Sequence, residues 1–151
     1  MKYRVETSPQ HGRGVFAAAP IGAGEAIMRF TGPLLEPPDV DFNDYHLQVG
    51  ERQYLGPSGQ ADDYVNHSCA PNCALQDGLV LTAMCDIAPG EELTWDYSTA
   101  IDEAGFAGFP CACGASNCRG AVRSFRDLSA TDRARLRPWL LPYLRAKYFP
   151  D

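Results

Sequence analysis

One seven-residue stretch constrains this chain more than any other: Asn66-His67-Ser68-Cys69-Ala70-Pro71-Asn72. It brings two carboxamides, an imidazole, a hydroxyl and a thiol together around a single proline. Burying polar groups at this density costs free energy unless each of them finds a hydrogen-bond partner. We therefore expect this loop to be held by defined partners from other parts of the fold.

Short apolar runs, separated by glycine and proline, dominate roughly the first hundred residues. Such runs predict β-strands, and the Gly/Pro positions between them predict turns. The expected strands are Tyr3–Thr7, Ala26–Phe30, Tyr45–Val49, Leu79–Met84 and Leu93–Tyr97. The chain is therefore predicted to be mainly β with short helices, in the α+β class, and built from small sheets with irregular connections.

The helical signal lies at the C-terminal end. Ser129, followed three residues later by Asp132, predicts an N-cap that opens a helix through Leu136. Pro138 and Pro142 limit how far one helix can continue. The tail beyond them is rich in leucine and aromatic residues. It is too apolar for a free linker and is expected to dock on the body of the domain.

At 151 residues, the chain has the size of one domain. It contains no run of about 18 apolar residues, so we expect no membrane contact. The first residues, from Met1 to Glu6, lack the apolar core of a secretory signal. We expect a cytoplasmic location, or a nuclear one in a eukaryote, and no secretion.

Charge is unevenly spread. Residues 1–118 carry five Lys/Arg and sixteen Asp/Glu, a net charge of −11, whereas residues 119–151 carry eight and three, a net charge of +5. Nucleic-acid binders usually present a basic face, so we expect no direct nucleic-acid binding. An acidic body can attract a basic peptide. A solvated acidic surface remains the alternative for any single carboxylate.

Three of the six cysteines, Cys111, Cys113 and Cys118, lie within eight residues. In a reducing compartment such a cluster is more often a metal site than a set of disulfides. Cysteines in a C-x-C pair bridge to each other only with strain, whereas both can bind one metal ion. Tetrahedral zinc takes four ligands, commonly thiolates. The pattern therefore predicts a zinc site with its fourth ligand elsewhere in the chain.

A glycine motif lies near the N-terminus. Residues 12–17, from Gly12 to Ala17, formally match the dinucleotide-binding pattern G-x-G-x-x-G/A. That pattern needs a helix directly after it, and Pro20 and Gly22 leave no room for one. The sequence that follows the motif therefore argues against dinucleotide binding. A glycine-rich turn without a ligand remains the alternative from the local residues alone.

Three segments in this order resemble the SET domain, the family of protein-lysine methyltransferases that use S-adenosylmethionine. The resemblance rests on the Asn-His-Ser-Cys loop, on Glu91-Glu92-Leu93-Thr94-Trp95-Asp96-Tyr97, and on the cysteine cluster through Cys118-Arg119-Gly120. It implies the SET-domain β-clip fold, with a knot-like crossing of the later chain through the Asn-His loop. It also implies a SET domain over 1–105, a post-SET zinc segment over 106–121, and a helical tail over 122–151 packed on the same domain.

The resemblance implies that S-adenosylmethionine binds at the glycine turn and at the Asn-His loop. In the family, the main chain of a G-x-G turn contacts the methionine part of the cofactor, and the missing Cβ lets a ligand approach the backbone. An Asn-His pair and a preceding aromatic residue also lie near the cofactor. The matching residues here are His11, Gly12, Arg13, Gly14, Tyr64, Asn66 and His67.

Tyr97 matches the family's catalytic tyrosine, and Phe30 and Trp95 match positions along the lysine channel. Three departures accompany this match. Phe30 stands where many members have tyrosine. Trp95 stands where Phe or Tyr is usual, at a position associated with how many methyl groups the lysine accepts. Asp63 stands where a basic residue is common.

The resemblance also supplies the fourth zinc ligand, Cys69 of the Asn-His-Ser-Cys loop, beside Cys111, Cys113 and Cys118. Such a site would tie the cofactor loop to the C-terminal segment. The two remaining cysteines, Cys73 and Cys85, are interpreted as small buried hydrophobic residues.

The leading hypothesis is a methyltransferase that transfers methyl groups to a lysine amine of a protein or peptide, with a histone-like tail as one fitting substrate. A SET-fold protein that binds peptide or cofactor with little catalysis is the alternative. A purely structural zinc module is a third hypothesis, but it would not need the glycine turn or the Asn-His pair. The oligomeric state is not predicted.

Overall fold

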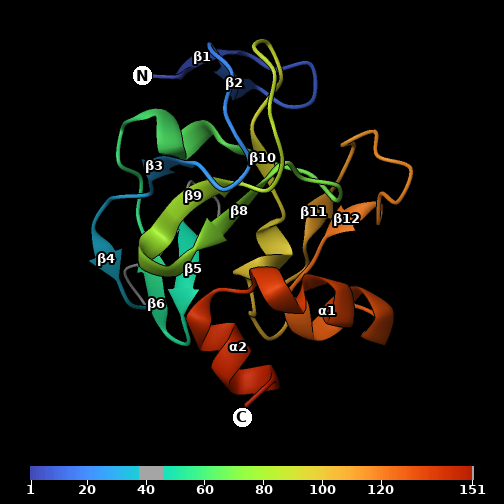
Figure 1. Ribbon diagram of the computed structural model, residues 1–151. Helices are drawn as coiled ribbons and strands as arrows, with labels where there is room; N and C mark the ends of the chain where they lie inside the picture. Colours follow the sequence, from blue (N-terminus) through green and yellow to red (C-terminus); the bar gives the residue numbers. More distant parts are fainter. Residues whose placement is uncertain (38–45, 151) are drawn as a thin grey trace.

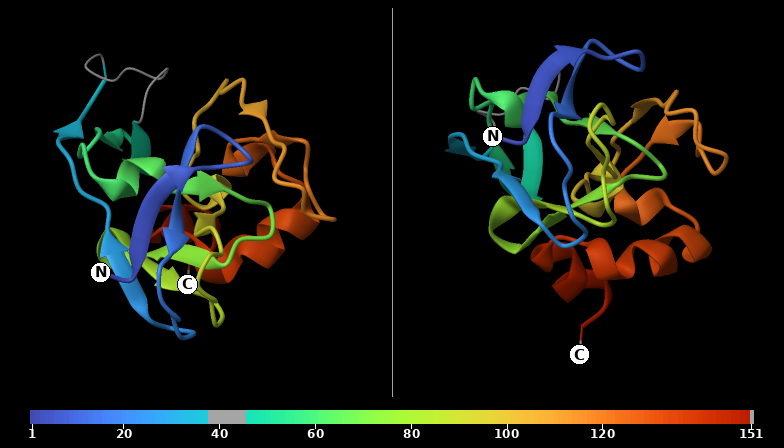
Figure 2. Two further views of the ribbon diagram at one scale, coloured as in Figure 1. Left: turned by 90° about the horizontal axis from the view of Figure 1, so that it is seen from above. Right: turned by 45° about the horizontal axis from the view of Figure 1, so that its top comes forward.

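The computed structural model describes residues 1–37 and 46–150 and shows small sheets around one core, with the helices at the C-terminal end (Figure 1). An N-terminal hairpin joins β1 (Tyr3–Thr7) to β2 (Arg13–Ala17), with Tyr3 opposite Ala17 and Thr7 opposite Arg13. Figure 1 and the right-hand view of Figure 2 place this hairpin at one end of the molecule, away from the C-terminal helices.

Two three-stranded antiparallel sheets form most of the body. One has the order β3-β9-β8, with β3 (Ala26–Arg29), β8 (Cys73–Gln76) and β9 (Val80–Ala83). The other has the order β4-β6-β5, with β4 (Leu34–Leu35), β5 (Leu47–Gly50) and β6 (Gln53–Leu55).

Two short strand pairs complete the fold. β7 (Asn66–His67) runs parallel to β10 (Thr94–Trp95), with Asn66 opposite Thr94 and His67 opposite Trp95. β11 (Phe109–Pro110) is antiparallel to β12 (Ala121–Val122). The parallel pair places the Asn-His loop directly against the later Thr94–Trp95 segment, as the predicted crossing requires.

The strand predictions were right in place and differed at their ends. The first strand is confirmed without change, and the second and fourth lose only their outer residues. The last is shorter, because Tyr97 opens a 3-10 turn over Tyr97–Thr99. Tyr45 of the predicted Tyr45–Val49 strand lies outside the described residues, and the observed strand runs from Leu47 to Gly50. The sequence missed seven strands, namely β2, β4, β6, β7, β8, β11 and β12.

The main core lies between the sheets. Its fully buried members include Val15, Leu75, Leu81, Leu93 and Trp95. They come from the N-terminal hairpin, the β3-β9-β8 sheet and the segment around β10. Removing these side chains from water provides the main favourable term for folding.

The C-terminal tail docks on the body, as predicted. α1 (Ala130–Leu136) is capped by Ser129, whose hydroxyl accepts the Asp132 N–H at 3.1 Å, and α2 (Pro142–Tyr148) has Pro142 in its first turn. Phe125, Leu128, Leu136, Leu140 and Leu144 form a second buried cluster. Leu141 joins the main core.

A buried carboxylate fixes the tail to the segment after Tyr97. The Asp102 side chain is fully buried and accepts hydrogen bonds from Arg126 Nη2 at 3.1 Å, Lys147 Nζ at 2.9 Å and Tyr148 Oη at 2.9 Å. Burial acts to raise the pKa of Asp102, but these hydrogen bonds outweigh it and hold that pKa below its ordinary value. The division at residues 105 and 121 stays a prediction.

Within residues 1–37 and 46–150, no helix combines the length and the apolar character that crossing a bilayer requires.

We expect Leu144→Ala to lower the free energy of unfolding by about 3 kcal/mol, because it opens a cavity in the tail cluster. Leu34→Ala is the matched control: Leu34 is 63% exposed, so its truncation should cost at most about 0.5 kcal/mol. Urea denaturation of both variants measures the difference. Equal costs would show that the tail cluster contributes little to stability.

Candidate active site

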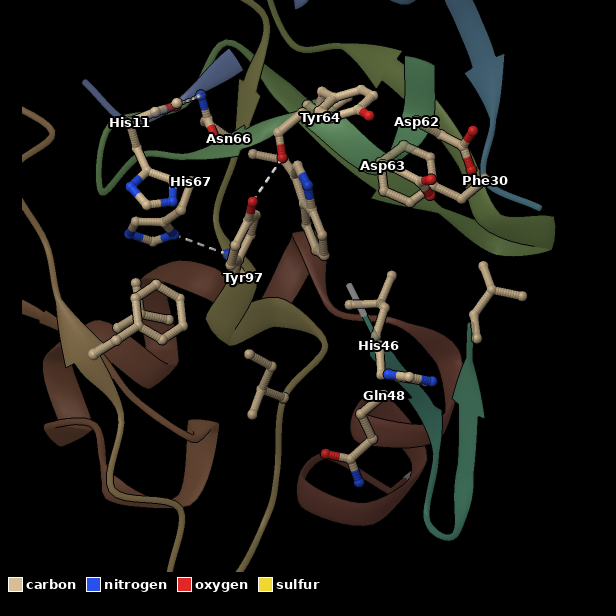
Figure 3. A pocket seen from close by; sticks show the side chains of 18 of the residues that line it. His11, Phe30, His46, Gln48, Asp62, Asp63, Tyr64, Asn66, His67 and Tyr97 are labelled. Atoms are coloured by element: carbon tan, nitrogen blue, oxygen red, sulfur yellow. Dashed lines mark hydrogen bonds between the residues drawn. The ribbon is translucent and has the colours of Figure 1, made fainter. Parts of the chain in front are cut away.

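A cavity of about 690 Å³ opens between the hairpin, the sheet that contains β6, and the segment that leads to the cysteine cluster (Figure 3). Nearly all residues predicted to bind cofactor or substrate line it. They are His11, Gly12, Arg13, Phe30, Tyr64, Asn66, His67, Trp95 and Tyr97. The fold thus brings together positions that lie up to 86 residues apart in the chain.

The two glycines of the turn have different roles. Gly12 has a φ of +49°, which disfavours other residues, and the space around its missing Cβ is open. Gly14 is absent from the cavity lining, and a Cβ there would lie 2.5 Å from Glu92 Oε2. Gly14 therefore makes room for a carboxylate, where the sequence predicted the approach of a ligand.

Asn66 holds the glycine turn in place. Its Nδ2 group donates to the carbonyl oxygens of His11 at 3.2 Å and Arg13 at 3.0 Å, and to Glu92 Oε2 at 2.8 Å. Ser8 Oγ donates to the other oxygen of Glu92 at 2.8 Å. Sequence reasoning treated Glu92 only as part of a motif, because nothing local marks it as the partner of a residue 26 positions earlier.

His67 joins the Tyr97 segment to the cysteine cluster. Its Nδ1 accepts the Tyr97 backbone N–H at 3.0 Å, and its Nε2 lies 3.4 Å from Cys69 Sγ. Burial lowers the pKa of His67 to about 4, so the ring is neutral near pH 7. Because Nδ1 accepts, the hydrogen-bond network assigns the proton to Nε2, from which it is donated to sulfur. Both ring nitrogens of His67 are therefore engaged by groups of the protein itself.

The Tyr97 hydroxyl donates to the Val65 carbonyl oxygen at 2.6 Å, as Figure 3 shows. Its ring centroid lies 4.9 Å from that of Trp95 and 5.3 Å from that of His67. A hydroxyl that donates one hydrogen bond keeps its oxygen lone pairs as acceptors. The phenol is therefore fixed in direction at the cavity wall and can still accept a hydrogen bond.

Phe30 and Trp95 form an apolar wall beside Tyr97. Both are buried, and their rings meet edge to face at 5.8 Å between centroids. The indole Nε1 of Trp95 is buried without a hydrogen-bond partner among the described residues. Phe30 has no hydroxyl, so the indole N–H of Trp95 is the hydrogen-bond donor that these two side chains can offer to a ligand.

Asp62 and Asp63 also line the cavity, but the carboxylates of both are engaged within the protein. Asp62 accepts from Ser58 Oγ at 2.6 Å and from the Thr31 N–H at 2.9 Å. Asp63 accepts the N–H groups of Ser58 at 2.9 Å and Gly59 at 2.7 Å. An acidic residue where the family has a basic one thus has a structural role here: it organises the turn before Tyr64.

The four predicted zinc ligands lie together. The Sγ atoms of Cys69, Cys111, Cys113 and Cys118 are all within 4.8 Å of one another. Tetrahedral zinc with bonds of about 2.3 Å places its sulfur atoms about 3.8 Å apart, and the Cys69 and Cys111 sulfurs are separated by 3.9 Å. The geometry and the thiol chemistry therefore both fit zinc.

Backbone donors surround these sulfurs. The N–H of Arg119 points to Cys69 Sγ and that of Gly120 to Cys118 Sγ, both at 3.4 Å. Burial acts to raise the pKa of Cys113, but hydrogen bonds from neighbouring backbone and thiol groups outweigh it and lower the pKa to about 6. Burial raises the pKa of Cys69 and that of Cys111, so Cys113 is the thiol whose surroundings favour the thiolate form that binds a metal ion.

The two remaining cysteines differ. Cys73 is buried as predicted, and burial raises its pKa to about 12. The prediction for Cys85 was wrong, because this residue is exposed. It lies two residues after the end of β9, at a point where the chain leaves the sheet for the surface.

A buried ion pair that the sequence did not predict lies next to the cysteine cluster. Arg119 Nη2 lies 2.8 Å from Asp96 Oδ1, and both side chains are almost completely buried. The same carboxylate oxygen lies 3.7 Å from His67 Nδ1. Arg119 directly follows a cysteine of the cluster and Asp96 directly precedes Tyr97, so the pair links the two segments.

Comparison with known proteins decides the family. Residues 12–98 match the family model described as "SET domain", which is more than half of the chain. The chain belongs to the SET domain family. The match ends at Ser98, so the cysteine cluster lies outside it except for Cys69.

Relatives of this SET domain chain include named enzymes. It is 33% identical over 145 residues to histone-lysine N-methyltransferase ATX2 of Arabidopsis thaliana, an alignment that covers 82% of this chain and 13% of the relative. It is 34% identical over 134 residues to histone-lysine N-methyltransferase 2B of Homo sapiens, covering 76% of this chain and 5% of the relative. The chain thus spans only a small part of the relatives that it matches.

Solved structures agree with the fold. A structure of KRYPTONITE in complex with mCHH DNA, an H3(1-15) peptide and SAH has a TM-score of 0.65 and 28% identity, and the match covers 80% of this chain and 29% of that one. A second KRYPTONITE structure, with mCHG DNA and SAH, has a TM-score of 0.66 and 30% identity, covering 82% and 30%. The expectation of no nucleic-acid binding is not supported, because these neighbours contain DNA.

We expect Cys113→Ser to lower zinc affinity by more than the roughly 10- to 100-fold that loss of an outer-shell partner costs. Stability should fall with it, because metal binding is coupled to folding. Cys85→Ser is the matched control, since Cys85 is exposed and outside the cluster. Elemental analysis and thermal denaturation check both variants. Unchanged zinc content in Cys113→Ser would remove this residue from the ligand set.

Proposed function

We propose that this chain is an S-adenosylmethionine-dependent protein-lysine methyltransferase. The observation that carries the proposal is the position of Tyr97. Its hydroxyl is held on the Val65 carbonyl at the wall of a cavity that also contains the glycine turn and the Asn-His loop. Membership of the SET domain family and the named histone-lysine methyltransferase relatives support the same activity.

The cofactor would bind at the end of the cavity formed by the glycine turn, Tyr64 and the Asn-His loop. Asn66 keeps the carbonyls of His11 and Arg13 in place, so the turn is organised before any ligand arrives. Arg13 stacks over the Tyr64 ring with 5.0 Å from the guanidinium carbon to the ring centroid. S-adenosylmethionine, when bound, supplies a methyl group on a positively charged sulfur.

The lysine amine would enter between Phe30, Trp95 and Tyr97. Lysine has an ordinary pKa of about 10.4, so the amine must lose a proton before it can attack the methyl group. An apolar wall beside a positive sulfonium disfavours the ammonium form. The Tyr97 oxygen can accept a hydrogen bond from the amine and align its lone pair for in-line transfer, which is how positioning contributes to the rate.

Zinc would be held by Cys69, Cys111, Cys113 and Cys118. Because Cys69 is two residues from His67, the metal would fix the Asn-His loop and the segment 111–118 on one side of the cavity. Metal removal is therefore expected to affect both stability and activity.

A basic, histone-like tail is the proposed substrate class. The net charge of −11 over residues 1–118 favours such a partner. The relatives named as histone methyltransferases favour the nuclear alternative of the predicted location. The alternative is a SET-fold protein that binds cofactor or peptide with little catalysis, and the missing hydroxyl at Phe30 is the structural argument for it. Cofactor binding without methyl transfer to lysine-rich protein would support this alternative.

We expect Tyr97→Phe to lower kcat by about 100-fold or more, because the amine loses the oxygen that aligns it. Cofactor affinity, measured by calorimetry, should change little. Tyr3→Phe is the control, since Tyr3 is partly buried but does not line the cavity. Near-normal turnover in Tyr97→Phe would remove this tyrosine from the catalytic role.

We expect Trp95→Phe to shift products towards higher methylation states, because a smaller ring without a donor leaves more room for a methylated amine. Mass spectrometry of the product peptide measures the proportions of mono-, di- and trimethyl-lysine. Trp139→Phe is the control, as Trp139 is not part of this cavity. An unchanged distribution in Trp95→Phe would show that the indole does not limit methylation.

A further inference from the structure

One carboxylate in the large cavity is placed to bind a ligand. Asp62, Asp63 and Glu103 all line the cavity. Both oxygens of each aspartate accept hydrogen bonds, from Ser58 and Gly59 of their own loop and from the Thr31 N–H. No hydrogen bond or ion pair reaches the Glu103 carboxylate from residues 1–37 or 46–150. Glu103 is thus the acidic side chain of this lining that a substrate can engage.

The main chain at Glu103 is fixed, although its carboxylate is not. Ser124 Oγ donates to the Glu103 carbonyl oxygen at 2.7 Å, and the Phe106 N–H reaches the same oxygen at 3.4 Å. The preceding residue is the buried Asp102, which is held by Arg126 and by the tail. The backbone therefore presents Glu103 from a defined position.

The neighbouring cation does not neutralise Glu103. Arg126 directs Nε and Nη2 to Asp102, at 3.2 Å and 3.1 Å from its carboxylate oxygens. Burial raises the pKa of Glu103, and Arg126 offsets this only in part. A carboxylate that has lost water without gaining a donor is stabilised when a cation binds to it.

Two phenylalanines accompany this carboxylate. Phe106 and Phe109 follow it on the same segment, line the same cavity, and meet edge to face at 6.4 Å between centroids. Phe109 is 44% exposed, and its centroid lies 6.3 Å from that of Tyr97. A guanidinium group both stacks on aromatic rings and forms paired hydrogen bonds with a carboxylate, whereas an ammonium group lacks the planar face.

We propose that Glu103, together with Phe106 and Phe109, binds the side chain of an arginine that lies near the target lysine in the substrate protein. This inference rests on the proposed methyltransferase function and names its substrate class. The segment 103–109 begins directly after the buried Asp102 and ends two residues before Cys111, and its Phe109 ring lies 6.3 Å from that of Tyr97, the proposed catalytic residue. It lies beyond the residues 12–98 that match the family model.

Lysine-centred peptides test this inference. In each peptide one of the four positions before or after the lysine is arginine or alanine, and the other positions are glycine and serine. For at least one position, we expect arginine to raise kcat/KM about tenfold over alanine, the order of one charge-assisted hydrogen bond. In Glu103→Gln, that ratio should fall to about one.

Three variants serve as controls and cross-checks. Glu36→Gln makes the same change of charge at an exposed residue outside the cavity, and it should keep the wild-type ratio. Glu103→Arg should reverse the preference towards peptides with an acidic residue at that position. Phe109→Leu should lower the ratio by a smaller factor, since it removes stacking and leaves the carboxylate.

The outcomes separate this inference from the proposed function. Methylated peptides with equal kcat/KM for arginine and alanine at every position would overturn the arginine site and leave the methyltransferase function standing. Calorimetric binding of the same peptides in the presence of S-adenosylhomocysteine gives the comparison without turnover. A Glu103-dependent binding preference without methylation would support the arginine site and overturn the proposed function. Equal binding without methylation would overturn both.

Discussion

The imidazole of His67 is the contact on which the site depends. It accepts the Tyr97 N–H at 3.0 Å on one side and lies 3.4 Å from the Cys69 sulfur on the other. The parallel pairing of β7 with β10 places it there, because His67 stands opposite Trp95. A buried, neutral ring can perform both tasks only with one tautomer, so the hydrogen bonds define its state. His67 therefore couples the position of the Tyr97 backbone to the position of Cys69 in the cysteine cluster.

Buried charges extend this link to the rest of the chain. The Asp96 to Arg119 pair joins the segment around Tyr97 to the cysteine cluster, and the Asp102 cluster joins the same segment to the C-terminal tail. Buried ion pairs add little net stability over apolar contacts, but they penalise any arrangement that separates the partners. The segment from Asp96 to Asp102 is thus held at one end by Arg119 and at the other by Arg126 and Lys147.

The polar loop at 66–72 found the partners that its composition required. Asn66 binds the glycine turn and Glu92, and His67 contacts Tyr97 and Cys69. Asn72 binds the segment of β10: it donates to the Glu92 carbonyl at 2.9 Å and accepts the Thr94 N–H at 2.9 Å. Sequence reasoning directed Asn66 and His67 towards the cofactor. In the structure, the Asn66 side chain instead holds the glycine turn, and the His67 ring contacts the Tyr97 N–H and the Cys69 sulfur.

The sequence by itself determined what depends on neighbouring residues. The Tyr3–Thr7 strand, the Ser129 cap and the cluster of Cys111, Cys113 and Cys118 follow from local pattern and spacing. The fourth cysteine, Cys69, followed from the resemblance to the SET family. Tertiary structure alone decided what depends on residues far apart. β2 and β8 are strands because of the strands they pair with, and Gly14 is required because Glu92 occupies the space of a Cβ. Cys85 is exposed. The Glu103 carboxylate lacks a hydrogen-bond donor among the described residues, whereas Asp62 and Asp63 each have donors. The physical reason is that propensity and capping act within a few residues, whereas burial, pairing and unmet hydrogen bonds arise only when distant segments meet.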